Sequence, residues 1–220
     1  MLAAHHPSSS SSGVGLAAGC IRPCSAIFGP SDNFITQKWL DAGAIELLTP
    51  EPTIDYVYVE NVVWGHLLLE RALLDTPAKV GGKAYCISNE EPVTGGDFYA
   101  KMCHFYKATT GRTLKVNYMP SRLLRGLSFV LEAVQWITRG ALKGEAAQLT
   151  PAMFHTAYCS YTFSSARARD ELSYRPLFSL DEGLQRTVAN WHGKQRSVSM
   201  MTEGRTTTSP NESQQARAHA

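Results

Sequence analysis

The stretch that decides the fold is Arg22-Pro23-Cys24-Ser25-Ala26-Ile27-Phe28-Gly29-Pro30. A segment of small and apolar residues, 15–21, precedes it and is predicted to form a buried strand that breaks at Pro23. Gly29-Pro30 is a turn sequence. In an open sheet of parallel strands, ligands bind beyond the carboxyl ends of the strands. The loop that ends at Pro30 is therefore the candidate functional loop.

Strand and helix patterns alternate along the rest of the chain. Strands are predicted at 54–59, 83–88, 113–118 and 161–163, and helices at 32–42, 62–74, 97–109, 120–143, 165–172 and 180–192. Ser31 or Asp32 is the expected N-cap of the first helix and Asn61 that of the second, and Gly111 should end the third. This alternation predicts an α/β fold.

The composition is that of an ordinary globular protein. The chain has 220 residues, of which 44% are hydrophobic and 18% charged, so one main domain is expected. Its net charge is +2 with scattered basic residues, which argues against a nucleic-acid partner. The five cysteines form no C-x-x-C pair, and His66, His104, His155 and His192 are isolated, so we expect neither a disulfide framework nor a metal site.

Both ends of the chain are polar. A serine tract covers residues 7–13, and a Thr-, Ser- and Gln-rich tail covers 197–220. Neither can bury enough apolar surface to offset its ordering entropy, so 1–14 and 196–220 are predicted to be disordered and 15–195 to form the domain. The sequence has no uncharged apolar run of about 18 residues, and no membrane-spanning helix is predicted.

The glycines at 13, 15 and 19 have nearly the spacing of a dinucleotide-binding loop. Such a loop needs a strand before it and a helix after it, because the helix N-terminus holds the pyrophosphate. Here a serine tract leads in and Pro23 opposes a helix soon afterwards. We therefore interpret this segment as a linker that runs into a strand.

The predicted helix at 120–143 is apolar on two faces. One stripe contains Leu127 and Val134, while Phe129 and Trp136 lie on the other side among basic residues, two turns apart. Aromatic residues mixed with basic ones are favourable at a membrane surface. Two interpretations of this second face remain open. Phe129 and Trp136 contact a membrane surface, or they pack against a neighbouring element.

The chain resembles the extended short-chain dehydrogenase/reductases, and within them the 3β-hydroxysteroid dehydrogenase/isomerase family. The resemblance covers residues 15–191 and is closest to the sterol-4α-carboxylate 3-dehydrogenases. It rests on four stretches that occur in the family's order: Arg22-Pro23 with Ile27-Phe28-Gly29-Pro30, Asp55-Tyr56-Val57-Tyr58-Val59-Glu60-Asn61, Ile87-Ser88-Asn89-Glu90-Glu91-Pro92, and Phe163-Ser164-Ser165-Ala166-Arg167 with Tyr174-Arg175-Pro176.

This resemblance implies an oxidoreductase of sterol or steroid biosynthesis. The enzyme would oxidise a 3β-hydroxyl with NAD or NADP, and in the carboxylate subgroup the product then loses carbon dioxide. The implied partner is a sterol, and we also expect a membrane surface and a homodimer. The expected location is the cytoplasmic face of the endoplasmic reticulum membrane or the cytoplasm.

The resemblance also assigns residues to the site. It places Arg22, Pro23, Cys24 and Ala26 near the nicotinamide of the cofactor. It places Phe28, Pro30, Asp32, Tyr58 and Asn61 near the substrate.

Two elements of the family are missing from the sequence. The family uses a tyrosine followed four residues later by a lysine as its base, and an N-terminal glycine loop for the pyrophosphate; no tyrosine here has a lysine at that spacing. We therefore expect the C-terminal, substrate-side part of an extended Rossmann-like fold, without the N-terminal dinucleotide-binding units and inactive alone. The alternatives are a non-catalytic sterol- or partner-binding remnant and a member related to nucleotide-sugar epimerases or dehydratases.

Overall fold

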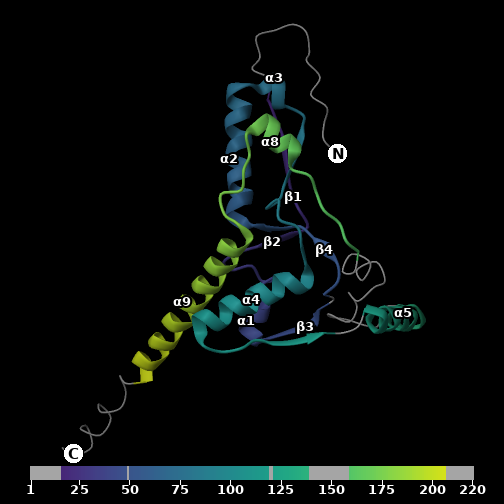
Figure 1. Ribbon diagram of the computed structural model, residues 1–220, viewed down its shortest axis with the longest axis vertical. Coiled ribbons are helices and arrows are strands. Elements are labelled where there is room, and N and C mark those ends of the chain that lie inside the picture. Colours follow the sequence, from purple (N-terminus) through teal and green to yellow (C-terminus); the bar gives the residue numbers. More distant parts are fainter. Residues whose placement is uncertain (1–15, 49, 119–120, 139–158, 207–220) are drawn as a thin grey trace, which may run out of the picture.

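The computed structural model describes residues 16–48, 50–118, 121–138 and 159–206 (Figure 1). Its strands pair two by two. The parallel pairs are β1 (Cys20–Pro23) with β6 (Ala84–Ile87), β2 (Ala26–Phe28) with β5 (Tyr56–Tyr58), and β3 (Ala44–Leu48) with β8 (Lys115–Tyr118). The antiparallel pair is β4 (Thr53–Ile54) with β7 (Val93–Thr94). With helices between most of the strands, the predicted α/β fold is confirmed.

The segment that contains β1 and β2 pairs first with β6 and then with β5. Cys20 N–H begins the ladder by donating to Lys83 O, and Cys24 N–H ends it by donating to Ile87 O, both at 2.9 Å. The chain then passes to β5, where Ile27 lies opposite Val57. The strand starts at Cys20, later than the predicted residue 15, because β6 begins only after the Gly82 turn; before it, Gly82 N–H donates to Ala18 O at 2.7 Å outside the ladder.

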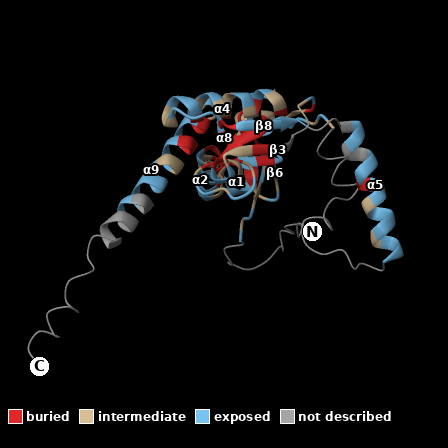
Figure 2. Cartoon of the chain, turned by 90° about the horizontal axis from the view of Figure 1, so that it is seen from below, coloured by how far each residue is buried: buried red, intermediate tan, exposed pale blue. Residues whose placement is uncertain are grey.

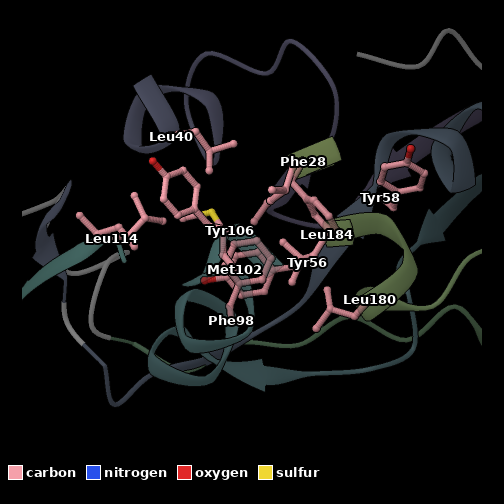
Figure 3. Close-up of a cluster of buried hydrophobic side chains, with 13 residues drawn as sticks. Phe28, Leu40, Tyr56, Tyr58, Phe98, Met102, Tyr106, Leu114, Leu180 and Leu184 are labelled. Atoms are coloured by element: carbon pink, nitrogen blue, oxygen red, sulfur yellow. The ribbon is translucent and has the colours of Figure 1, made fainter. Parts of the chain in front are cut away.

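Strand β5 is buried on both faces, as is usual for parallel sheets. Tyr56 and Tyr58 point into one hydrophobic cluster, together with Phe28 and Phe98 (Figure 3). Val57 points the other way, into a second cluster. This alternation has the period of two that a strand imposes, so the two clusters lie on opposite sides of β5.

Two sets of helices cover these clusters. The first cluster packs against α1 (Gln37–Ala42), α4 (Gly95–Thr110) and α9 (Leu180–Thr206). The second packs against α2 (Val59–Asp75), α3 (Pro77–Val80) and α8 (Ala166–Leu172). Gly183 allows α9 to approach β5, because a Cβ atom there would lie 2.8 Å from Cγ of Tyr58.

Several predicted boundaries differ from the structure. Helix α2 begins at Val59 with Tyr58 at its cap position, so Asn61 lies inside the first turn. Helix α1 begins at Gln37 because the Asp32 carboxylate accepts the preceding N–H groups, including those of Phe34 and Thr36, both at 2.9 Å. Helix α9 continues to Thr206, so residues 196–206, predicted to be disordered, are helical. At 161–163 the structure has an isolated bridge between Tyr161 and Ile54 in place of a strand.

Other predictions agree with the structure or fall outside the described residues. Helix α4 ends at Gly111, which is left-handed with φ 71°, as predicted. Helix α5 (Ser121–Ile137) lies within the predicted range 120–143, whose end is not described. Residues 1–14 and 207–220, predicted to be disordered, also lie outside the described part.

Helix α5 stands apart from the other elements in both views (Figures 1 and 2). Its exposed apolar residues belong to both predicted faces: Leu123, Leu127, Phe129, Val130, Val134, Trp136 and Ile137. Among the described residues, no helix combines the length and the apolar character that crossing a membrane requires.

Candidate functional site

The candidate loop follows β1 and carries β2 in its second half. Cys24, Ala26 and Phe28 are buried, while Ser25 and Ile27 between them are exposed. Side chains therefore alternate across this segment as they do in a strand. The predicted contacts of Phe28 with a substrate cannot come from an open face, because its ring is 0% exposed and packs edge-on against Phe98 at 5.3 Å.

The turn after β2 is held in a single conformation. Gly29 has no room for a side chain, because a Cβ atom would overlap Val59. Ser31 has a positive φ of 70°, and Asp32 N–H donates to Gly29 O at 3.2 Å. The Asp32 carboxylate accepts hydrogen bonds from the N–H groups of Ile35 and Thr36 and from the Thr36 hydroxyl. Asp32 therefore shapes the loop from within, and Pro30, half-buried, lies at its start.

Tyr58 is an interior residue. Its ring lies 5.6 Å from that of Phe28 and 5.6 Å from that of Phe178. Its hydroxyl donates to Glu60 at 3.0 Å, and burial, with Glu60 adding to it, raises the pKa of Tyr58 to about 12. The side chain predicted to border the substrate is therefore neutral at physiological pH and packed behind the loop.

Asn61 belongs to a buried polar cluster. Its Nδ2 donates to Oδ1 of Asn89 and to the carbonyl of Phe178, both at 2.8 Å. Its Oδ1 accepts the N–H groups of Leu177 at 2.8 Å and of Phe178 at 3.0 Å. Asn89 Oδ1 also accepts Tyr58 N–H at 3.0 Å. All donors and acceptors of the Asn61 amide are thus used to join α2, the end of β6 and the entry to α9.

The rest of the turn that begins at Asn89 has structural partners too. Glu90, with φ 57°, forms an ion pair with Arg169 at 3.3 Å. Glu91 accepts the N–H of Leu180 at 3.1 Å, in the first turn of α9. Sequence reasoning used these residues as family markers and missed their role, because their partners lie about 80–90 positions away.

The titratable groups near the loop are not activated. Burial, with a smaller contribution from Asp55, raises the pKa of the Cys24 thiol to about 12, so it is protonated at physiological pH. Burial also raises the pKa values of Tyr56 and Tyr174. Asp55 is buried with a raised pKa, and its Oδ2 accepts Phe163 N–H at 2.5 Å. Cys24, Tyr56 and Tyr174 are therefore protonated at neutral pH, and the Asp55 carboxylate is engaged by the backbone at Phe163.

The open face of the loop is formed by residues that the sequence prediction passed over. Ser25 and Ile27 point outward, Ile27 with 40% of its surface exposed, and Phe34 is 73% exposed in the following turn. Strand alternation from the buried Phe28 could have identified Ile27. Arg22 is also exposed, on β1, and Pro23 is half-buried. Phe129 and Trp136, on α5, are 52% and 83% exposed and are not brought to this loop.

The residues predicted to border the nicotinamide have small side chains where the chain leaves β1. Cys24, Ser25 and Ala26 follow the end of β1, and of these only Ser25 is exposed. No described glycine-rich turn connects a strand to a helix N-terminus in the way that a pyrophosphate requires. Among these residues there is also no group of three or more histidine, cysteine or acidic side chains arranged to hold a metal ion.

Comparison with known proteins identifies related sequences. The model of the "3-beta hydroxysteroid dehydrogenase/isomerase family" matches residues 2–116, slightly more than half of the chain. The 3beta-hydroxysteroid-dehydrogenase/decarboxylase isoform 1 of Arabidopsis thaliana is 32% identical over 182 residues, which are 79% of this chain and 40% of that protein. The mouse sterol-4-alpha-carboxylate 3-dehydrogenase, decarboxylating, is 30% identical over 78% of this chain and 47% of its own length. The chain thus spans less than half of either relative.

Solved structures show the same fold. UDP-glucose 4-epimerase from Thermotoga maritima superposes with a TM-score of 0.52 at 20% identity, over 82% of this chain and 47% of that one. At this level of identity the likeness concerns the fold, which is that of extended Rossmann-like proteins.

Proposed function

The chain belongs to the 3-beta hydroxysteroid dehydrogenase/isomerase family, and on this premise we propose that it forms the substrate-binding side of an NAD(P)-dependent sterol oxidoreductase. The substrate would be a 3β-hydroxysterol. The name of the mouse relative suggests a sterol that also carries a carboxylate at the neighbouring 4α position, and the name of the Arabidopsis relative also includes a decarboxylase. The observation that carries this proposal is that Ser25, Ile27 and Phe34 are exposed along the segment that contains the carboxyl ends of the parallel strands β1 and β2, within the family match.

The roles of the residues follow from their positions. Ile27 and Phe34 would contact the apolar rings of the sterol, since both offer exposed apolar surface. Arg22, Pro23, Cys24 and Ala26 would border the nicotinamide, which accepts a hydride when the cofactor is bound. Phe28, Pro30, Asp32, Tyr58 and Asn61 would act as positioning residues, because their side chains support the loop from inside.

The chain's own contribution to the reaction would be binding and orientation. A 3β-hydroxyl must lose a proton as its carbon loses a hydride, and the tyrosine and lysine that remove the proton in this family have no counterpart at the required spacing in this sequence. The described residues would hold the sterol and exclude water around its ring carbons. A ketone formed beside a 4α-carboxylate would accept the electrons of decarboxylation.

We also propose that α5 lies on a membrane surface. Its apolar residues are exposed on both faces, and Arg122 is exposed at its start. A sterol dissolved in the bilayer would then reach the loop without crossing water. The cytoplasmic face of the endoplasmic reticulum membrane would be a suitable location for such a reaction.

Equilibrium binding tests the proposed substrate class. The chain would be titrated with a fluorescent 3β-hydroxysterol in cyclodextrin, with unlabelled sterol, UDP-glucose and NADH as competitors. We expect saturable binding that only the unlabelled sterol displaces, and weaker binding by an Ile27→Glu variant than by a Val63→Glu control on α2, where Val63 is also exposed. Displacement by UDP-glucose would favour the nucleotide-sugar alternative, and the absence of saturable binding would refute the sterol proposal.

A turnover assay separates an enzyme from a binding protein. With a 3β-hydroxysterol and NAD or NADP, we expect no NADH or NADPH formation by the chain alone. Sterol binding without turnover would be shared by the substrate side of an enzyme and by a non-catalytic remnant. The chain would then be joined to the part of the mouse relative that it does not match. Turnover by this hybrid would identify the chain as the substrate side of an enzyme.

A further inference from the structure

We propose that the cavity between α1, α4 and α9 binds a small organic oxyanion, a phosphate or carboxylate attached to an apolar group. Its volume is about 520 Å³, within the range of roughly 300–1,000 Å³ found for small-molecule sites. None of the residues that line it belongs to the candidate loop at 22–30. The cavity is therefore a second location, separate from the proposed sterol site.

Two of the hydrogen-bond acceptors in this cavity are engaged within the protein. Asp41 Oδ1 accepts the indole N–H of Trp191 at 2.7 Å and an amide N–H of Gln195 at 3.2 Å. The Thr110 hydroxyl donates to Tyr106 O at 2.8 Å and accepts Arg112 N–H at 3.1 Å. These two groups therefore hold the lining together.

Donors, in contrast, remain open. The guanidinium groups of Arg112 and Arg196 line the cavity, and neither makes an ion pair or hydrogen bond with another described side chain. Tyr106 and His192 also line the cavity. Two cationic side chains without ion-pair partners in one lining favour a ligand that accepts hydrogen bonds and carries negative charge.

The floor of the cavity is apolar. Leu40 is 1% exposed and Tyr106 6%, and the Tyr106 ring lies 5.5 Å from the ring of Trp191. This surface would pack against an apolar or aromatic group of the ligand. A phosphate or carboxylate joined to such a group satisfies both parts of the lining.

Two helix ends work against an anion here. Helices α1 and α4 finish at the cavity, and the C-terminus of a helix carries a partial negative charge of about 0.5. However, α1 has only six residues, and the Tyr106 and Lys107 carbonyls at the end of α4 already accept hydrogen bonds. The two guanidinium groups, which reach into the cavity from separate elements, should therefore determine which ligand binds.

The indole N–H of Trp191 provides a local probe, because it points to Asp41 in the lining. Its proton–nitrogen NMR signal, assigned with a Trp191→Phe variant, would be followed during titration with phenyl phosphate, benzoate and inorganic phosphate at constant ionic strength. Sodium chloride alone is the salt control. The matched control variant is Arg71→Gln, since Arg71 lies on α2 with its side chain 82% exposed.

We expect a saturable shift of this signal with phenyl phosphate or benzoate, and the tighter of the two identifies the preferred oxyanion. Arg112→Gln and Arg196→Gln should each weaken binding at least about tenfold, since each removes a charge-assisted hydrogen bond, whereas Arg71→Gln should leave it unchanged. A shift that does not saturate, that sodium chloride reproduces, or that both arginine variants retain would overturn the proposal. Sterol binding at the loop is measured independently, so the two sites can fail separately.

Discussion

Asn61 Nδ2 donates to Asn89 Oδ1 at 2.8 Å, and both side chains are buried. The two residues come from the first turn of α2 and the end of β6, 28 positions apart. Together they also bind the backbone at Phe178, just before α9. Since α9 packs behind β2 and β5, this pair fixes the support on which the candidate loop rests.

Replacing Asn61 by alanine should destabilise the fold. The change removes one of the hydrogen bonds of Asn89 and leaves the N–H groups of Leu177 and Phe178 without their acceptor, and we expect a loss of about 3 kcal/mol of unfolding free energy from these unsatisfied groups. Urea unfolding of Asn61→Ala would measure it, with Asn190→Ala, an exposed position on α9, as the control. Equal stability of the two variants would contradict the role given to the Asn61 cluster.

Two glycines of α9 should respond in opposite directions to alanine. At Gly183 a Cβ atom would lie 2.8 Å from Tyr58 and 3.0 Å from Phe28, whereas at Gly193 no atom lies within 4 Å. Gly183→Ala should therefore cost about 1–3 kcal/mol by overpacking, and Gly193→Ala should stabilise the helix by up to about 1 kcal/mol. Thermal unfolding measures both. Shifts of the same sign would mean that α9 does not pack on β5 as described.

Asp55 should make stability depend on pH. Burial raises its pKa in the folded state above the ordinary value of 3.8, so the folded state binds the proton more tightly than the unfolded state does. Ionised Asp55 therefore opposes folding at neutral pH, and this effect fades as the pH falls through the raised pKa towards 3.8.

The substitution Asp55→Asn tests this sign, because the amide oxygen can still accept Phe163 N–H. We expect the variant to be at least as stable as the parent chain at pH 7, with its relative stability falling towards pH 4. Urea unfolding at both pH values measures the difference. A variant that loses more stability at pH 7 than at pH 4 would show that the ionised carboxylate stabilises the fold.

Helix α5 should attach the protein to lipid. The double variant Phe129→Ser and Trp136→Ser removes two exposed aromatic side chains, and flotation with anionic liposomes should weaken at least about tenfold, because their burial at the interface contributes more than 1.4 kcal/mol. The control is Leu74→Ser, which removes another exposed apolar side chain, on α2. Unchanged flotation, or unfolding of the double variant without loss of lipid binding, would contradict the membrane proposal.

The sequence identified most elements because the signals for them are local. Local strand patterns at 54–59, 83–88 and 113–118 predicted β5, β6 and β8, and Gly111 marked the end of α4. Residues 54–59 were predicted as one strand, but the ladder is interrupted at Asp55, whose carboxylate binds Phe163 N–H. That partner is 108 positions away, so no local pattern indicates the break.

The candidate site was harder to predict than the fold. An asparagine at the start of a helix is a typical N-cap, and nothing near Asn61 in the sequence reveals that its amide binds Asn89 and Phe178 instead. Family resemblance placed the candidate residues on one loop but did not separate inward from outward side chains. The alternation of buried Ala26 and Phe28 with exposed Ile27 provides that distinction.

Photochemical cross-linking tests the central claim most directly. A 3β-hydroxysterol with a photoreactive group on its ring system would be irradiated with the chain, and the labelled peptides would be identified by mass spectrometry. The account predicts labelling within residues 25–34, around Ile27 and Phe34, that excess unlabelled 3β-hydroxysterol prevents and UDP-glucose does not. Labelling that unlabelled sterol fails to prevent, or that falls on α5 and α9 and spares this loop, would contradict the claim that the loop is the sterol-binding side of the protein.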